Sequence, residues 1–147
     1  MAYLMNSDIE QRLGNATYVQ LADDNGDGAA DTAVVDEARL GAEGEINSYL
    51  AFRFQVPIDL SLHADLVGVL KSMTLDLVEF RLRCRRPPVP QDAIRKRDSA
   101  VEWLRGVVNG SIGLPAAAAV SANPTRGIVA VKTGSERLLT RKEFSGF

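Results

Sequence analysis

The stretch from Asp23 to Asp31 holds the residues of this 147-residue chain that are most suited to chemistry. It reads Asp-Asp-Asn-Gly-Asp-Gly-Ala-Ala-Asp, with oxygen ligands at positions one, three, five and nine of a calcium loop and glycine at position six. These ligands are Asp23, Asn25, Asp27 and Asp31. Position twelve requires a bidentate glutamate but is Val34, so a calcium-binding helical module is the less favoured of two interpretations. A glycine-rich turn in which Asp31 caps the next helix is favoured.

Other side chains with reactive potential are isolated. His63 is the only histidine, so it has no second imidazole for a metal site, and no nucleophile motif surrounds it. Cys84 is the only cysteine, and its helical spacing from Leu77 and Phe80 predicts a buried thiol. The glycine-rich segments match neither a phosphate loop nor a dinucleotide fingerprint. We therefore expect a protein without enzyme activity and without a cofactor.

Charge is unevenly distributed along the chain. Residues 1–45 hold ten acidic and two basic residues, whereas residues 46–147 hold nine acidic and 15 basic ones. Seven cations flank one proline-rich turn: Arg81, Arg83, Arg85, Arg86, Arg95, Lys96 and Arg97. They form a solvated face, a contact with DNA phosphates, or a contact with the acidic first third of a neighbouring copy through Asp36 and Glu37. The subunit contact is favoured because its acidic partner is present in the same sequence.

The elements that position these residues are predicted to be helical. A first helix has a capping box between Ser7 and Glu10 and ends at Gly14. Residues 17–21 are undecided between a helical and an extended turn. The next helix covers about residues 32–52, and its apolar stripe comprises Val35, Ala38, Ala42, Ile46, Tyr49 and Leu50.

Residues 45–57 form a corner around which the rest of the chain is organised. Pro57 disfavours the helical region for the residue before it, so the chain becomes extended there. Ser61 is predicted to cap a helix over residues 62–84, and a last helix over residues 91–109 ends at Gly110. Tyr49 and Leu50 are predicted to be buried against the helix that follows the corner, near Leu66 and Leu70.

The composition changes after residue 114. Residues 115–124 are small and bounded by prolines, and residues 127–134 are rich enough in β-branched side chains to form a short strand. We predict that residues 115–147 form an extended arm that binds a neighbouring protein. The predicted interface residues of this arm are Ile128, Val129, Val131, Phe144 and Phe147.

The sequence as a whole predicts a mainly α protein. A bundle of about four helices over residues 1–114, with a turn-rich acidic loop, precedes the extended C-terminal arm. The contents of 46% hydrophobic and 24% charged residues are those of one globular domain. Because no apolar run is long enough to span a bilayer and no leader is evident, we expect a soluble protein made in the cytoplasm.

Five segments, taken in order, carry a family resemblance. They are Ser7–Gly14, Leu21–Asp24 with Asp31, Ile46–Phe54 closing at Pro57, Leu75–Leu82, and Val101–Gly110, and the closing Phe144–Phe147 adds to them. In these segments the chain resembles the Mu-type phage neck proteins, which are helical head-completion or head–tail adaptor proteins of tailed phages and prophages. Two positions depart from the pattern: Asn47 replaces an expected aspartate and Phe54 an expected tyrosine.

The resemblance implies a structural protein of the virion neck. Twelve copies would form a homo-oligomeric ring that completes the head between the portal protein and a tail-side stopper or tail-terminator protein. DNA would pass through the lumen of this ring and make only non-specific contacts with it. The resemblance implies no enzyme activity and no contact with a membrane.

Overall fold

A computed structural model describes residues 3–114, which form five α-helices and one short 3-10 helix. The elements are α1 (Asn6–Leu13), α2 (Asn15–Ala22), α3 (Thr32–Leu50), η1 (Ala64–Leu66), α4 (Val67–Cys84) and α5 (Gln91–Asn109). Residues 17–21, undecided from the sequence, belong to α2. No strand occurs within the described residues, and the prediction of a mainly α bundle is confirmed.

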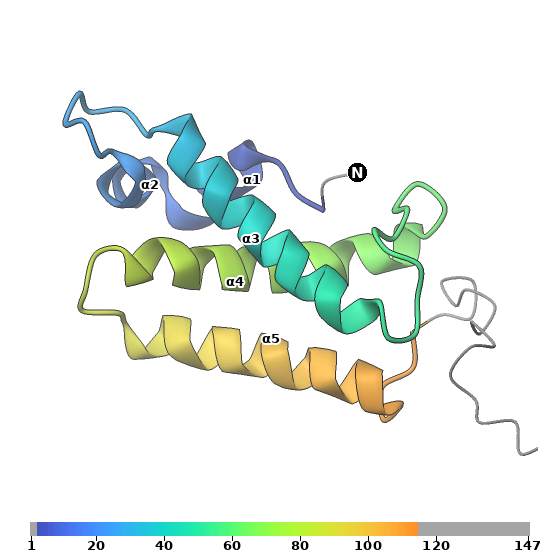
Figure 1. The fold of residues 1–147 in the computed structure, drawn as a ribbon. Helices are drawn as coiled ribbons and strands as arrows, with labels where there is room; N and C mark the ends of the chain where they lie inside the picture. The colour runs from blue at the N-terminus through green and yellow to red at the C-terminus, as the bar shows by residue number, and fades with distance from the viewer. Residues whose placement is uncertain (1–2, 115–147) are drawn as a thin grey trace, which may run out of the picture.

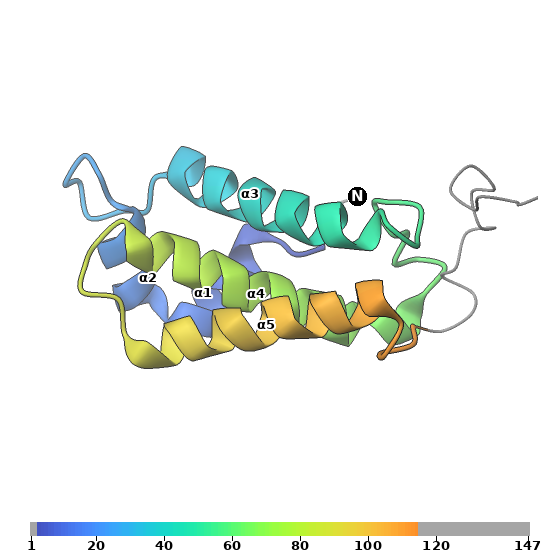
Figure 2. The same cartoon turned by 60° about the horizontal axis from the view of Figure 1, so that its bottom comes forward.

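The central helix of the bundle is α4. It contacts all four other α-helices, and α5 lies antiparallel beside it (Figure 1). Helix α3 crosses α4 obliquely, so its C-terminal end approaches the end of α5 while its N-terminal end lies away from α5 (Figure 1, Figure 2). Among the described residues, α1 and α2 pack against α3 and α4 and not against α5.

The hydrophobic core lies where α3 and α5 pack against α4. Its best-buried large side chains, each less than 2% exposed, include Ile9, Ile46, Leu50, Leu70, Leu77, Leu82 and Leu104. The predicted stripe of α3 is confirmed, because all its members are buried except Tyr49, which is half-buried. Leu50 belongs to the same core cluster as Leu66 and Leu70, as predicted.

Two glycines end helices as predicted, but the start of α1 differs from the prediction. Gly14 follows α1 with φ +76°, and Gly110 follows α5 with φ +80°, a region that favours glycine. Helix α1 begins at Asn6, and the Met5 N–H donates to Asp8 Oδ2 at 2.9 Å. The predicted capping box of Ser7 is therefore wrong, because that residue already lies inside the first turn.

Helix α4 begins five residues later than predicted, after η1. Ser61 does not cap it, because both its N–H and its hydroxyl donate to Asp59 Oδ1, at 2.9 and 2.6 Å. This carboxylate holds the serine in a local turn away from the helix. The predicted cap is therefore wrong, and His63, which precedes η1, lies before α4 and not in its first turn.

Tyr3 connects the N-terminal segment to the corner between α3 and α4. Its backbone N–H donates to Glu43 Oε1 at 2.9 Å, and its hydroxyl donates to Asn47 Oδ1. The same hydroxyl accepts a hydrogen bond from the Ile58 N–H at 3.0 Å. Because Tyr3 is only 4% exposed, these bonds are shielded from water. The amide of Asn47 therefore supplies a hydrogen-bond acceptor at the position where the resemblance expects an aspartate.

Residues 115–147 lie outside the described residues, so the division of the chain at residue 114 stays a prediction. The same holds for the strand over residues 127–134 and for the interface residues Ile128, Val129, Val131, Phe144 and Phe147. Within residues 3–114, no helix is both long and apolar enough to cross a bilayer.

Candidate functional site

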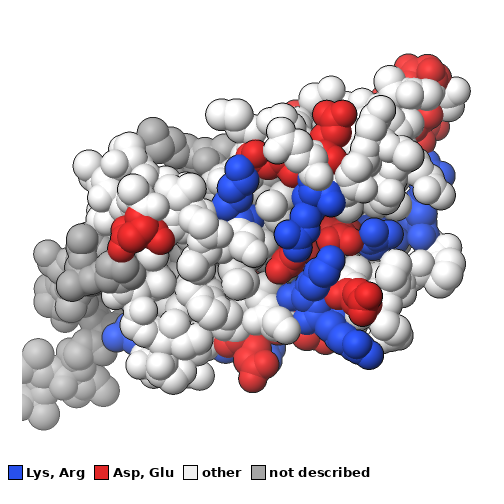
Figure 3. All heavy atoms as spheres, turned by 180° about the vertical axis from the view of Figure 1, so that it is seen from behind, with Lys and Arg blue, Asp and Glu red and all other residues white. Residues whose placement is uncertain are grey.

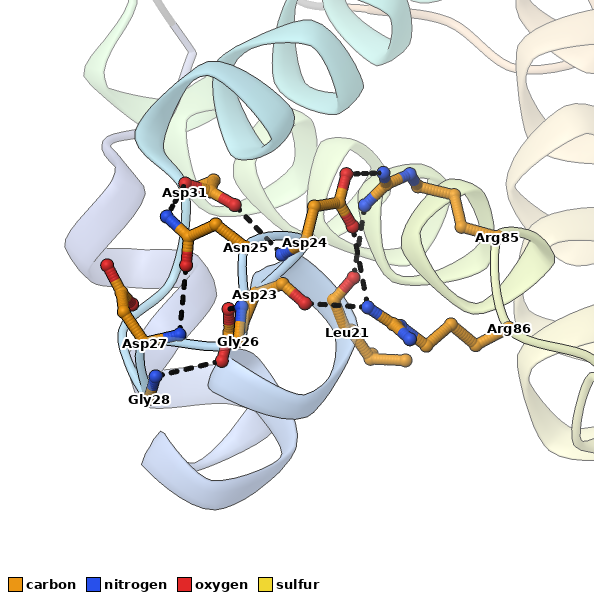
Figure 4. A network of polar contacts seen from close by, with 10 residues as sticks. All are labelled: Leu21, Asp23, Asp24, Asn25, Gly26, Asp27, Gly28, Asp31, Arg85 and Arg86. Carbon is orange, nitrogen blue, oxygen red and sulfur yellow. Dashed lines mark hydrogen bonds and ion pairs between the residues drawn. The ribbon is translucent and has the colours of Figure 1, made fainter.

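The acidic loop, residues 23–31, connects α2 to α3 and is held by its own side chains (Figure 4). The Asp23 carboxylate accepts hydrogen bonds from the N–H groups of Gly26 and Gly28, at 2.6 and 3.0 Å. The Gly26 bond in particular lowers the pKa of Asp23 below its ordinary value. Asn25 Oδ1 accepts from the Asp27 N–H at 2.9 Å. These are the side-chain-to-backbone bonds of the glycine-rich turn that the sequence favours.

Asp31 occupies the N-cap position of α3, but its side chain makes no hydrogen bond to that helix. Its carboxylate turns back and accepts from the Asp24 N–H at 2.8 Å and from Asn25 Nδ2 at 3.2 Å. The predicted side-chain cap is therefore wrong, and Asp31 closes the loop instead. Across residues 3–114, no group of three or more His, Cys, Asp or Glu side chains is arranged to hold a metal ion.

Calcium binding by the acidic loop is expected to be weak. The bidentate glutamate that completes such loops is replaced by Val34, so we expect a dissociation constant of about 1 mM or higher. Calorimetric titration with calcium chloride measures this constant, and the variant Asp23→Asn with Asp27→Asn is the control for non-specific binding. A micromolar constant that the control loses would restore the calcium-module interpretation.

Two arginines at the end of α4 bind the acidic loop (Figure 4). Arg85 pairs with the Asp24 carboxylate and donates to the Leu21 carbonyl at 3.2 Å. Arg86 donates to the Asp23 carbonyl at 2.7 Å and lies 3.4 Å from Asp24 Oδ1. We call Asp24, Arg85 and Arg86 the arginine clamp, because they connect α4 to the loop between α2 and α3.

The seven cations that flank the proline-rich turn form what we call the basic corner. Those outside the arginine clamp are also paired within the chain. Arg81 Nη2 lies 2.9 Å from Glu45 Oε2. Its guanidinium lies over Gly41, where a Cβ would be only 2.9 Å from Nη1. The remaining pairs are Arg83 and Lys96 with Glu79, Arg95 with Asp92, and Arg97 with Asp98. Each of the seven predicted cations therefore has a carboxylate partner among the described residues.

Glu79 is the most buried carboxylate of this set, with 7% of the residue exposed. Arg83 Nε donates to its Oε1 at 2.9 Å, and Lys96 Nζ donates to its Oε2 at 3.2 Å. Burial by itself raises the pKa of Glu79, but these hydrogen bonds outweigh burial and hold the pKa below its ordinary value. The contacts therefore stabilise the fold at neutral pH, and this contribution is lost as the pH falls through the folded-state pKa.

Charged side chains gather over one half of the molecule. In the view from behind, lysine and arginine alternate with aspartate and glutamate over this half, whereas the other half is largely free of charge (Figure 3). The charged half includes the end that carries the acidic loop. The segment between α3 and α4, at the opposite end, exposes the large apolar side chains Phe52 (68%) and Leu62 (75%). The two ends of the bundle therefore differ in chemistry.

Asp36 and Glu37, the predicted acidic partners, have different surroundings on α3. Asp36 Oδ1 accepts from Asn6 Nδ2 at 2.9 Å and from Arg39 Nη2 at 3.0 Å, and these bonds lower the pKa of Asp36. Glu37 is exposed and takes part in no ion pair within residues 3–114. Of the two, Glu37 is the one whose charge is not compensated there.

A groove of about 470 Å³ lies between α3 and α4 beside the start of α5, and we call it the wedge groove. Its apolar lining consists of Val34 and Ala38 on α3 and of Leu77 and Phe80 on α4. Cys84 also lines the groove and is exposed, so the predicted buried thiol is wrong. The physical reason is the oblique course of α3, which lies away from α5 near its start and leaves the last turn of α4 uncovered (Figure 1).

Reversing both arginines of the clamp should loosen the acidic loop without unfolding the bundle. In Arg85→Glu with Arg86→Glu, like charges face Asp24, and we expect a loss of about 1 kcal/mol because exposed ion pairs contribute little. Urea unfolding measures this loss, and amide exchange of the loop glycines should become faster. Adding Asp24→Arg should reverse both effects, whereas Arg95→Glu should change neither. Unchanged amide exchange in the double variant would contradict a clamp that holds the loop.

The fold and the site define a small helical bundle whose charged corner is built from structural ion pairs. Residues 3–133 match the sequence pattern of a family described as Bacteriophage Mu, Gp36. Because the match covers most of the chain, the protein belongs to this family, and the resemblance to a Mu-type phage family is confirmed. No curated protein sequence matches the chain.

Family membership indicates a phage structural or morphogenesis protein and fits association with the virion. Residue patterns alone missed three carboxylates that pair with the basic corner, namely Asp24, Glu45 and Glu79. The spacing of Glu79 and Arg83, one helical turn apart, was the one available signal. The other two acids lie far from their arginines in the sequence, so only the fold brings them together.

Proposed function

We propose that this protein is a head–tail connector subunit. Copies of it form a ring between the portal protein and the tail, complete the head, and surround the DNA that leaves it. The observation that carries the proposal is the family match over residues 3–133, combined with the neck role that the sequence resemblance implies. The role is structural and not enzymatic, and its place is the neck of the virion.

The different chemistry of the two ends of the bundle supports a ring. A ring requires heterologous contacts, in which one surface of a copy meets a different surface of the next copy. The charged half and the apolar residues Phe52 and Leu62 provide two such surfaces on one rigid bundle. Twelve copies are expected, to match the portal that the resemblance implies.

The ion pairs within the basic corner lower the positive charge that it presents to a neighbouring subunit or to DNA. Arg81, Arg83, Arg85 and Arg86 share three carboxylates of the same chain, so part of their charge is compensated. A contact of this corner with a neighbouring subunit remains part of the proposal. This pairing would weaken a contact with DNA in the lumen, because phosphate binding depends on uncompensated cations.

Native mass measurement of the protein, alone and mixed with the portal protein, tests this function. We expect the portal to recruit about twelve copies, in keeping with a closed ring. Arg95→Glu, which changes a highly exposed residue paired with its neighbour Asp92, serves as a control and should assemble normally. A protein that never associates with the portal or with itself would contradict the proposed function.

A further inference from the structure

The wedge groove combines an apolar floor with charged side chains around it. Leu77 and Phe80 form its floor, and Val34 and Ala38 form the wall on α3. The Arg97 guanidinium lies over the Phe80 ring, 5.4 Å from its centroid. The groove's volume of about 470 Å³ is in the range of about 300–1,000 Å³ of sites that bury apolar groups of ligands. A segment with several aliphatic side chains therefore fits this groove by size and by chemistry.

One carboxylate that lines the groove, Glu37, favours an occupant with a cation at that position. Three arginines line it, and each has a carboxylate partner in the chain: Arg81 with Glu45, Arg85 with Asp24, and Arg97 with Asp98. Glu37 lines the same groove without an ion-pair partner among residues 3–114. Glu37 is therefore the carboxylate of the groove that can pair with a cation of an occupant, whereas Arg85 shares Asp24 with Arg86.

One segment of the chain outside the described residues has the complementary composition. Residues 126–132 read Arg-Gly-Ile-Val-Ala-Val-Lys, an aliphatic run with a cation on either side. The family match ends at residue 133, so it includes this run and leaves out residues 134–147. The family pattern thus covers both the helical bundle and this run.

The chain beyond α5 is long enough to reach a groove at the far end of the bundle. Helix α5 runs from the wedge groove, which Arg97 lines, toward Asn109 at the other end of the bundle (Figure 1). These two residues are separated by about 18 Å along the helix axis. Ile128 lies 14 residues beyond Leu114, and an extended segment of this length reaches up to about 50 Å. The segment is therefore long enough to reach back along α5 to its own groove or across to an adjacent copy, and the proposed head-to-tail ring favours the adjacent copy.

We propose that residues 126–132 of one copy occupy the wedge groove of the next copy, where Ile128, Val129 and Val131 cover the apolar floor and Lys132 or Arg126 approaches Glu37. This inference rests on the proposed ring and identifies one contact that builds it. Each copy then gives one segment and receives one, which is the arrangement of a closed heterologous ring.

Cys84, the only cysteine, lines the groove and provides a direct test. A disulfide forms only when two Cα atoms approach to about 4.4–6.8 Å. In the full-length variant Ala130→Cys, incubated with the portal protein and oxidised with diamide, we expect a ladder of covalent oligomers on a non-reducing gel. Ser135→Cys, a control outside the run, and Ala130→Cys with Cys84→Ser should cross-link at most a tenth as fast.

The charge on the groove is tested in the same background. Glu37→Lys should slow cross-linking of the Ala130→Cys protein at least tenfold, and adding Lys132→Glu should restore at least half of the rate. Glu102→Lys makes the same charge change at an exposed glutamate outside the groove and should leave the rate unchanged. Equal slowing by the two lysine variants would contradict the role assigned to Glu37.

The outcomes separate this contact from the proposed function. Cross-linked monomers without oligomers would show that the segment returns to its own groove and would overturn the inference. Rings of unmodified protein on the portal, combined with no cross-link above the control rate, would also overturn it while the connector function stands. Absence of any ring would overturn the connector function, and with it the contact between copies.

Discussion

Replacing Leu50 with alanine is expected to lower the free energy of unfolding by about 2–5 kcal/mol, the range for a fully buried leucine. Leu50 has no exposed surface and lies at the end of α3, in one core cluster with Leu66 and Leu70. The substitution leaves a cavity in the core between α3 and α4. Urea unfolding followed by circular dichroism measures the loss.

Leu40→Ala is the matched control, because it makes the same chemical change on the same helix. Leu40 is 59% exposed, so its truncation should change the free energy of unfolding by less than about 0.5 kcal/mol. A loss below about 0.5 kcal/mol for Leu50→Ala as well would contradict the register in which α3 packs on the core.

Removing residues 115–147 should abolish or strongly weaken assembly and leave the helical bundle folded. Residues 3–114 contain a continuous core of their own, and the N-terminal segment is connected to it through Tyr3. We therefore expect a circular dichroism signal of the same helices and a cooperative unfolding transition. Mass measurement with the portal protein should show at least a tenfold loss of bound copies.

A second truncation after residue 133 separates the two halves of the removed segment. It retains the aliphatic run with Ile128, Val129 and Val131 and removes Phe144 and Phe147. We expect this shorter protein to keep most of its assembly, because the proposed contact is still present. Unfolding of the protein truncated at residue 114 would show that the tail belongs to the core. Normal assembly of that protein would show that the interface lies on the helices.

The parts of the fold that depend on local residue chemistry could be predicted from the sequence. The glycines at 14 and 110 end their helices, and the apolar period of α3 identifies its buried face. Both signals act within one or two turns of helix, so no knowledge of the fold is required. The start of α4 could not be predicted in this way, because Asp59 competes for the hydroxyl of Ser61.

The site depends on contacts between distant parts of the chain, which local patterns do not reveal. Asp24 meets Arg85 across 61 positions, and Arg81 meets Glu45 across 36. From the sequence, a contact of the arginines with the acids of a neighbouring copy is favoured, whereas the fold pairs many of these residues within one chain. Cys84 illustrates the same limit, because its exposure follows from the crossing angle of α3 and not from its position on α4.

A reconstruction of the neck of the virion by electron cryomicroscopy tests the central claim most directly. The connector account predicts a ring of these helical bundles between the portal and the tail, with twelve copies around the DNA channel. Each wedge groove in that ring should hold density for an extended segment from the adjacent copy. A neck without this bundle, in particles that contain the protein elsewhere or lack it, would contradict the account.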